Sequence, residues 1–214
     1  MYRSILRAAL ILSVASGSLF GGSILIGTST NSNVFPFGAN GTRYQQAYAS
    51  VDFSSAISIT GIDFFLVGAG NLNGGTYQLS LSTITAGIDT LSDSNFDGNL
   101  GADNTFFTSV ALYGAAPSTL SFTGGPYLYN PANGNLLLDI QILNPVGGGG
   151  ASFQATSSAF GIFSRYHNFG SGTIGYGLVT QFDFGATSIP EPGTLSLLGL
   201  GLLGLAAAAR RRSR

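Results

Sequence analysis

The 214-residue sequence has no cysteine and no tryptophan, and charged side chains make up only 8% of it. Without cysteine, the chain forms no disulfide and has neither a thiolate metal site nor a cysteine nucleophile. Lysine is also lacking, and of the arginines only Arg43 and Arg165 lie within residues 24–189. Eight aspartates give that segment a formal charge of −6, which excludes a basic surface for nucleic acid.

The sequence has few side chains that can act in general acid–base catalysis. His167 is the single histidine, no Gly-x-Ser-x-Gly motif is present, and the single glutamate is Glu191. No spacing of aspartates indicates the facing carboxylate pair that a glycosidase requires. We therefore expect a protein that is not an enzyme and has no organic cofactor, with a hydrolase as the least favoured alternative.

Short segments of alternating apolar and polar residues recur in the middle of the chain, which is typical of half-buried β-strands. They lie at residues 57–64, 76–82, 136–142 and 176–184. Runs of Gly, Pro and Asn, which favour turns, separate them at residues 71–75, 124–126, 130–134 and 144–146. Gly61 interrupts one alternating segment and predicts a β-bulge. The pattern predicts an all-β domain over residues 24–187, an antiparallel β-sandwich or jelly roll of about eight to ten strands.

The first 23 residues have the features of a secretory signal peptide. Arg3 and Arg7 precede an apolar stretch from Ala8 to Val14, and small residues follow at 16–18 and again at 21–23. Either small-residue run can serve as the cleavage site. We expect a signal helix over residues 1–23 that directs the chain to the Sec translocon.

A three-part segment follows the predicted sandwich. Residues 190–193 read Pro-Glu-Pro-Gly, residues 194–209 are uncharged and rich in leucine and glycine, and residues 210–214 are basic. As a helix, residues 194–209 have no polar face, which favours lipid over a protein surface; a buried helix is the alternative. The arginines cannot enter hydrocarbon and stop transfer on the cytoplasmic side. These four stop-transfer residues are Arg210, Arg211, Arg212 and Arg214.

Residues 188–214 resemble the PEP-CTERM sorting signal of Gram-negative bacteria. The resemblance is carried by Pro190, Glu191, Pro192 and Gly193, by the leucine/glycine helix and by the terminal arginines. It implies recognition by an exosortase, a membrane-embedded protease, and cleavage near the motif. It also implies an inner-membrane-anchored precursor and a mature form at the cell surface or outside the cell, in exopolysaccharide or biofilm settings. More loosely, segments 43–48, 77–83, 99–103 and 134–140 resemble passenger domains of such proteins.

One segment has the spacing of a calcium-binding loop. Residues 93–99 read Asp-Ser-Asn-Phe-Asp-Gly-Asn, which places oxygen ligands at alternate positions before a glycine. The predicted ligands are Asp93, Asn95, Asp97, Asn99 and Asp103. The alternative is an Asx-rich turn, since the same residue types favour ordinary turns.

Three functions are compatible with these features. The first is a non-catalytic surface or extracellular-matrix protein, which agrees with the scarcity of ionisable side chains. The second is a carbohydrate-binding module, for which Tyr127 and Tyr129, two residues apart, are candidates for an aromatic platform. Packing of these tyrosines within a sheet is the alternative. The third is a hydrolase.

Overall fold

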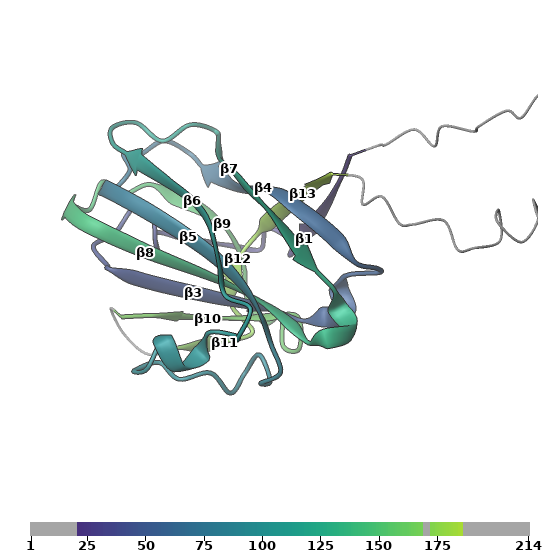
Figure 1. The fold of residues 1–214 in the computed structure, drawn as a ribbon. Helices are drawn as coiled ribbons and strands as arrows, with labels where there is room; N and C mark the ends of the chain where they lie inside the picture. Colours follow the sequence, from purple (N-terminus) through teal and green to yellow (C-terminus); the bar gives the residue numbers. More distant parts are fainter. Residues whose placement is uncertain (1–20, 169–171, 186–214) are drawn as a thin grey trace, which may run out of the picture.

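The computed structural model describes residues 21–168 and 172–185, which form two antiparallel sheets packed face to face (Figure 1). The predicted all-β sandwich is therefore confirmed. The first sheet contains β1 (Gly22–Ile26), β2 (Asn31–Asn33), β4 (Ile57–Val67), β7 (Thr119–Tyr129), β9 (Ser152–Thr156), β12 (Gly177–Leu178) and β13 (Thr180–Gly185). The second contains β3 (Arg43–Tyr48), β5 (Gly74–Ile84), β6 (Thr105–Leu112), β8 (Asn135–Gly147), β10 (Phe163–His167) and β11 (Thr173–Ile174).

The strand order of each sheet combines segments that lie far apart in the sequence. The first sheet runs β1-β13-β4-β9-β12, with β7 also paired to β4 and β2 to β9; the second runs β11-β10-β3-β8-β5-β6. The described residues thus hold thirteen strands, more than the eight to ten predicted. The excess comes from β2, β11 and β12, which have two or three residues each and are too short to show an alternating pattern.

The core lies between the sheets and is rich in aromatic rings. Phe37 has no exposed surface, and its ring centroid lies 4.9 Å from that of Phe64 and 5.2 Å from that of Phe153. Tyr77 and Leu79 on β5 are also fully buried. The face that the alternating pattern assigned to the interior is therefore the face that packs. Burial of such rings supplies much of the apolar area that holds a sandwich together.

Bulges account for one confirmed and one wrong prediction. Gly61 lies at a shift in register between β4 and β7, as predicted: Ile59 pairs with Tyr127, whereas Gly61 pairs with Thr123. The intervening residues 124–126 were predicted to form a turn, but they lie within β7, as the extra residues of this bulge. Gly and Pro are tolerated at bulges as well as in turns, so composition did not separate the two.

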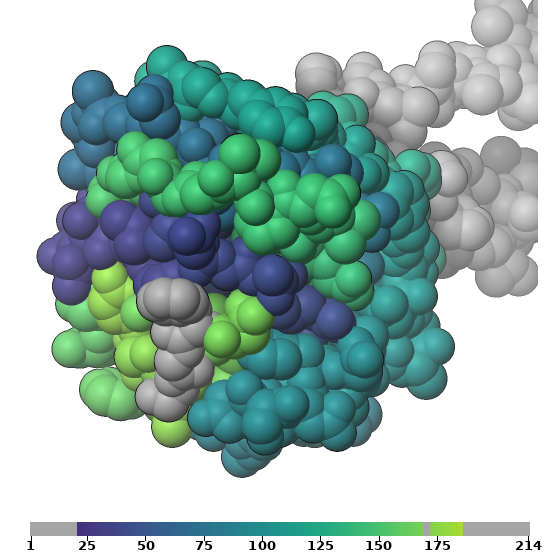
Figure 2. All heavy atoms as spheres, turned by 90° about the vertical axis from the view of Figure 1, so that its left-hand side faces the viewer, coloured from purple at the N-terminus to yellow at the C-terminus, as the bar shows by residue number. Residues whose placement is uncertain are grey.

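Residues 144–146 were also predicted as a turn and instead lie inside β8. Figure 2 looks onto this end of the sandwich, where residues 144–151 (green) lie between residues 34–42 (purple) and 66–72 (blue). Hydrogen bonds join these segments, from Gly150 N to Gly38 O at 2.8 Å and from Asn71 N to Gly149 O at 3.1 Å. Residues 148–150, a glycine-rich loop after β8, therefore close one end of the sandwich.

The two predicted signals flank the described fold. β1 begins at Gly22, which pairs with Phe184 of β13, so an earlier cleavage, near residues 16–18, leaves β1 complete. Residues 1–20 of the predicted signal helix and the segment 188–214, including its apolar helix, lie outside the described residues. Gly22 and Ser23, predicted as the end of that helix, are instead the first residues of β1, because they pair with Phe184 and Asp183 of β13. Within residues 21–168 and 172–185, no helix has the length and apolar character needed to cross a membrane.

Candidate functional site

The outer face of the six-stranded sheet is covered over only part of its area. Residues 85–104, which connect β5 to β6, fold over it. Their side chains Ile88, Leu91, Phe96 and Leu100 pack on Ala47, Leu137 and Tyr166 of the sheet in a second, smaller apolar cluster. On β8 this cluster includes Leu137, whereas Asp139, two residues further along on the same face, bonds to the polar side chains of Arg43 and Gln45.

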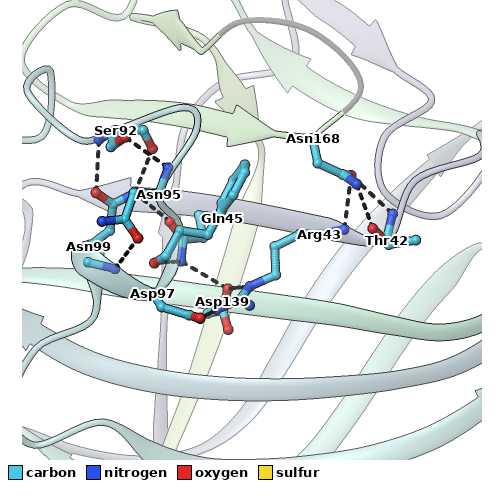
Figure 3. Close-up of polar contacts among 11 residues, drawn as sticks. Thr42, Arg43, Gln45, Ser92, Asn95, Asp97, Asn99, Asp139 and Asn168 are labelled. Carbon is cyan, nitrogen blue, oxygen red and sulfur yellow. Dashed lines mark hydrogen bonds and ion pairs between the residues drawn. The ribbon is translucent and has the colours of Figure 1, made fainter.

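A network of hydrogen bonds marks the edge of this cover (Figure 3). Gln45 on β3 donates from Nε2 to the backbone oxygen of Phe96 at 2.9 Å and to Asp139 Oδ1 at 3.0 Å. Asn99 donates from Nδ2 to Gln45 Oε1 at 2.8 Å and to the backbone oxygen of Ser92 at 2.7 Å. The segment is thereby attached to β3 through buried amides, whose bonds are costly to leave unmade.

Among the described residues, Arg43 is the only basic side chain in this network. Its Nε lies 2.6 Å from Asp139 Oδ1, and its second contact is from a terminal nitrogen to Asp97 Oδ1 at 3.0 Å. The two carboxylates differ in environment, because the Asp139 side chain is 2% exposed whereas that of Asp97 is 81% exposed. The Arg43–Asp139 pair is therefore the buried half of the network.

Asp139 is only half satisfied. Its Oδ1 accepts from Arg43 and Gln45, but its Oδ2 is buried and has no hydrogen-bond partner among the described residues. In Figure 3 one oxygen of this carboxylate faces Arg43 and Gln45, and the other points away from them. A buried oxygen without a partner is uncommon in proteins and calls for an explanation, such as a water, an ion or a ligand that binds there.

A hollow of about 170 Å³ adjoins this residue on the uncovered part of the sheet. Asp139, Gln141, Gln78, Leu79, Ser80, Asn104 and Phe106 line it. Asp139 pairs with Ser80 across β8 and β5, and Gln141 pairs with Gln78. Alternation along the strands thus places four polar side chains together on one face, beside the edge of the covering segment.

A larger hollow, of about 530 Å³, lies at the end of the sandwich closed by the glycine-rich loop. Its lining is mostly backbone and small side chains: Leu66, Gly68, Ala69, Gly70, Asn71, Ala115, Ala116, Ser118 and Gly149. None of these side chains is ionisable, so the lining of this hollow has no group that could act as an acid or a base.

His167 is packed rather than presented to solvent. Its ring stacks on that of Phe35, with centroids 4.4 Å apart and planes within 11°. Burial lowers the pKa of His167, and the positive charge of Arg165 lowers it further. The Arg165 guanidinium in turn lies over the Tyr176 ring, 4.1 Å from its centroid.

The five predicted calcium ligands are not brought together. Asn95 accepts from Gly98 N at 3.1 Å, and Asn99 is turned inward to Gln45. Asp97 pairs with Arg43, and Asp103 accepts from Thr83 N at 2.7 Å. Among the residues described, no three His, Cys, Asp or Glu side chains are grouped so as to hold a metal. Calcium binding by this loop stays a prediction.

The predicted tyrosine platform is wrong. Tyr127 is 5% exposed and Tyr129 is fully buried, because both lie on the inner face of β7. The Tyr127 hydroxyl donates to Asp103 Oδ2 at 2.8 Å, and that of Tyr129 donates to the backbone oxygen of Gly134 at 2.8 Å. The polar hollow around Asp139 was not predicted. Its one sequence signal is an aspartate inside the otherwise apolar run from Leu136 to Ile140.

The fold defines an all-β sandwich protein. We call the polar hollow lined by Asp139, on the outer face of the six-stranded sheet, the recess. Residues 188–212 match the family model of the PEP-CTERM protein-sorting motif. The chain therefore carries a PEP-CTERM sorting motif, which confirms the resemblance and marks an exported protein sorted through an exosortase. Pro190, Glu191, Pro192 and Gly193 lie within the match, as do Arg210, Arg211 and Arg212.

Among solved structures, the chain is similar to the cysteine protease and lectin-like domains of Cwp84, a surface layer associated protein of Clostridium difficile. The two share 11% identity with a TM-score of 0.42, over 69% of this chain and 32% of that one. This chain thus aligns with about a third of that chain's length. No curated protein matches the sequence.

Proposed function

We propose that this protein is a non-catalytic component of the cell surface or extracellular matrix, associated with exopolysaccharide. The observation that carries the proposal is the sorting motif at residues 188–212, because exosortase substrates are exported and attached to the membrane before cleavage. In this proposal an exosortase recognises Pro190–Gly193, the apolar helix 194–209 anchors the precursor, and the mature protein is released to the surface.

The absence of catalysis is supported by how the ionisable groups are used. Asp139 and Asp97 share Arg43, and Asp103 accepts from Thr83 and Tyr127. Asp63 and Asp183 both accept from the Gln181 amide, at 3.5 and 2.9 Å, and neither lines the two hollows described above. A hydrolase needs an acid and a base facing one substrate across a cleft, and of these five carboxylates only Asp139 lines one of the two hollows.

The sorting route is tested in a Gram-negative host with an exosortase and in the same host lacking it. Mass spectrometry of the surface-released protein is expected to find a C-terminus near Pro192 in the first host only. A variant with Pro190, Glu191 and Pro192 all changed to alanine should remain in the membrane fraction, whereas Thr194→Ala serves as a matched control. Recovery of the Arg210–Arg214 segment in the released form contradicts the proposal.

A carbohydrate-binding module is the second candidate. The buried tyrosines no longer favour it, but the polar recess beside Asp139 does, because it combines amide, hydroxyl and carboxylate groups with one exposed aromatic ring.

A further inference from the structure

In the recess on the outer face of the six-stranded sheet, one oxygen of the Asp139 carboxylate has no hydrogen-bond donor among the described residues. Asp139 is 1% exposed, and its Oδ2 has no partner among the described residues. Arg43 and Gln45 both donate to Oδ1, so neither satisfies the second oxygen. A molecule that brings a donor to this point removes the penalty of a buried, unpaired carboxylate oxygen.

The rim of the recess is able both to donate and to accept. Gln78, Ser80, Asn104 and Gln141 line it, and none of these side chains takes part in a hydrogen bond within the described part of the chain. Amides and hydroxyls offer donors and acceptors together, as do the hydroxyls of a sugar. Four unengaged groups of this kind around one recess are a matching set for a polyhydroxylated ligand.

An exposed ring stands beside these polar groups. Phe106 on β6 is 61% exposed and pairs with Ser80 on β5, which places it on the same outer face. A large apolar ring at the edge of a polar recess gains from being covered by another apolar surface. The C–H face of a sugar ring provides such a surface, while its hydroxyls point towards the amides.

Charge and size narrow the class of ligand. Arg43, Asp97 and Asp139 together carry a net charge of −1, and the arginine is engaged by both carboxylates. An anionic sugar would meet repulsion from Asp139 across a short distance. The volume of about 170 Å³ is below the roughly 300–1,000 Å³ of pockets for drug-sized molecules, so it suits a single ring.

We propose that this recess binds one neutral sugar residue of a polysaccharide, with a ligand hydroxyl donating to Asp139 Oδ2, Gln78 and Gln141 bonding its other hydroxyls, and Phe106 covering its apolar face. Because Oδ2 has no exposed surface, the half-buried side chains of Gln78 or Gln141 move aside as the hydroxyl enters. The inference rests on the proposed function in one respect only: binding occurs without cleavage.

The test uses the full chain, labelled with ¹⁵N and titrated with glucose, galactose, mannose and glucuronate. At least one neutral hexose is expected to shift the amide signals of Gln78, Ser80, Asn104, Phe106 and Gln141 with a Kd in the millimolar range, about 1 mM or weaker. Glucuronate is expected to bind at least about tenfold more weakly. Absence of shifts with all three neutral sugars, or shifts confined to other residues, overturns the proposal.

Two variants with matched controls locate the site. Phe106→Ala is expected to weaken binding by about tenfold, a typical loss for one stacked ring, whereas Phe160→Ala, also exposed at 70%, leaves it unchanged. Gln141→Ala weakens binding in the same way, and Gln154→Ala on β9 does not. Asp139→Asn is expected to abolish binding; if it fails to fold, the first two variants decide. Unaltered affinity in Phe106→Ala and Gln141→Ala refutes the assignment.

Failure here is distinguishable from failure of the proposed function. The same protein is incubated with dextran and galactomannan, two neutral polysaccharides, and their chain lengths are measured. Shortened chains contradict the non-catalytic role while leaving the recess as a sugar site. Release of the protein with a C-terminus near Pro192 but no sugar binding leaves the sorting route intact and refutes the recess.

Discussion

Arg43 Nε donates to Asp139 Oδ1 at 2.6 Å, and this contact joins β3 to β8 at the edge of the segment that covers the sheet. The pair is nearly excluded from water, with side-chain exposures of 16% and 2%. The Arg43 guanidinium therefore holds the Asp139 carboxylate, which lines the recess, in position.

Removing the arginine should destabilise the fold strongly. Arg43→Ala leaves the buried Asp139 charge uncompensated, which typically costs about 3–5 kcal/mol. Asp97→Ala is the matched control, because it removes the exposed contact of the same guanidinium and should cost at most about 1 kcal/mol. Urea unfolding followed by circular dichroism measures both. Equal losses in the two variants would contradict the distinction between the buried and exposed contacts.

The covering segment approaches the sheet too closely for one of its glycines to be replaced. A Cβ at Gly101 would overlap the backbone oxygen of Thr83 and lie 2.9 Å from Asp103 Oδ1. Gly101→Ala is expected to cost about 1–3 kcal/mol through overpacking. Gly87, in the same segment, has its nearest neighbour at 3.4 Å, the hydroxyl of Thr90, so Gly87→Ala should be tolerated. A thermal melt of each variant checks the difference.

Stability should fall in mildly acid solution because of His167. Burial, and secondly Arg165, lower the pKa of His167 in the folded state, so the unfolded chain binds the proton more tightly. The free energy of unfolding therefore decreases as the pH drops from about 7 to about 5.5, below the ordinary histidine pKa.

The variant His167→Phe keeps the ring contact with Phe35 and removes the titration. Urea midpoints measured at both pH values should differ in the native protein and differ less in this variant. The same pH dependence in both proteins would show that other groups, such as the aspartates, are responsible.

Calcium binding at residues 93–99 predicts a higher melting temperature in about 1 mM calcium, a concentration typical of extracellular sites. Asp97 and Asn99 would have to leave their contacts with Arg43 and Gln45 to take part. Asp93→Ala should abolish the shift, and magnesium at equal ionic strength is the control. An unchanged melting temperature in the intact protein refutes the site.

The alternating pattern was sufficient for the sandwich because its signal is local. In the alternating segment 76–82 the apolar residues Tyr77, Leu79 and Leu81 share one face, and that face is fully buried. Bulges were harder, since residues 124–126 have the composition of a turn and lie within β7. Pairing with β4 on both sides of residues 124–126 continues the strand through them. The local sequence does not indicate which strand will be the partner.

The recess was beyond prediction for a physical reason. Alternation places Asp139 and Gln141 on the outer face, where polar residues normally meet water. Asp139 is instead buried and bonded to Arg43 and Gln45, which lie 96 and 94 residues away in the chain, and no local pattern reports such a contact. The prediction for Tyr127 and Tyr129 failed for the opposite reason. Their spacing predicted a platform on the surface, but both side chains lie on the inner face of β7 and are buried.

The pairing of β13 has a mechanical consequence. This strand lies between β1 and β4, with hydrogen bonds along both edges, and it ends at Gly185, just before the sorting motif. When the chain is held beyond residue 185 and the sandwich is pulled by a bound polymer, the load runs lengthwise along β13. Both ladders then resist together in shear, so the rows of bonds must break at once rather than one after another. We therefore expect this domain, when it is tethered through the residues after Gly185, to resist pulling.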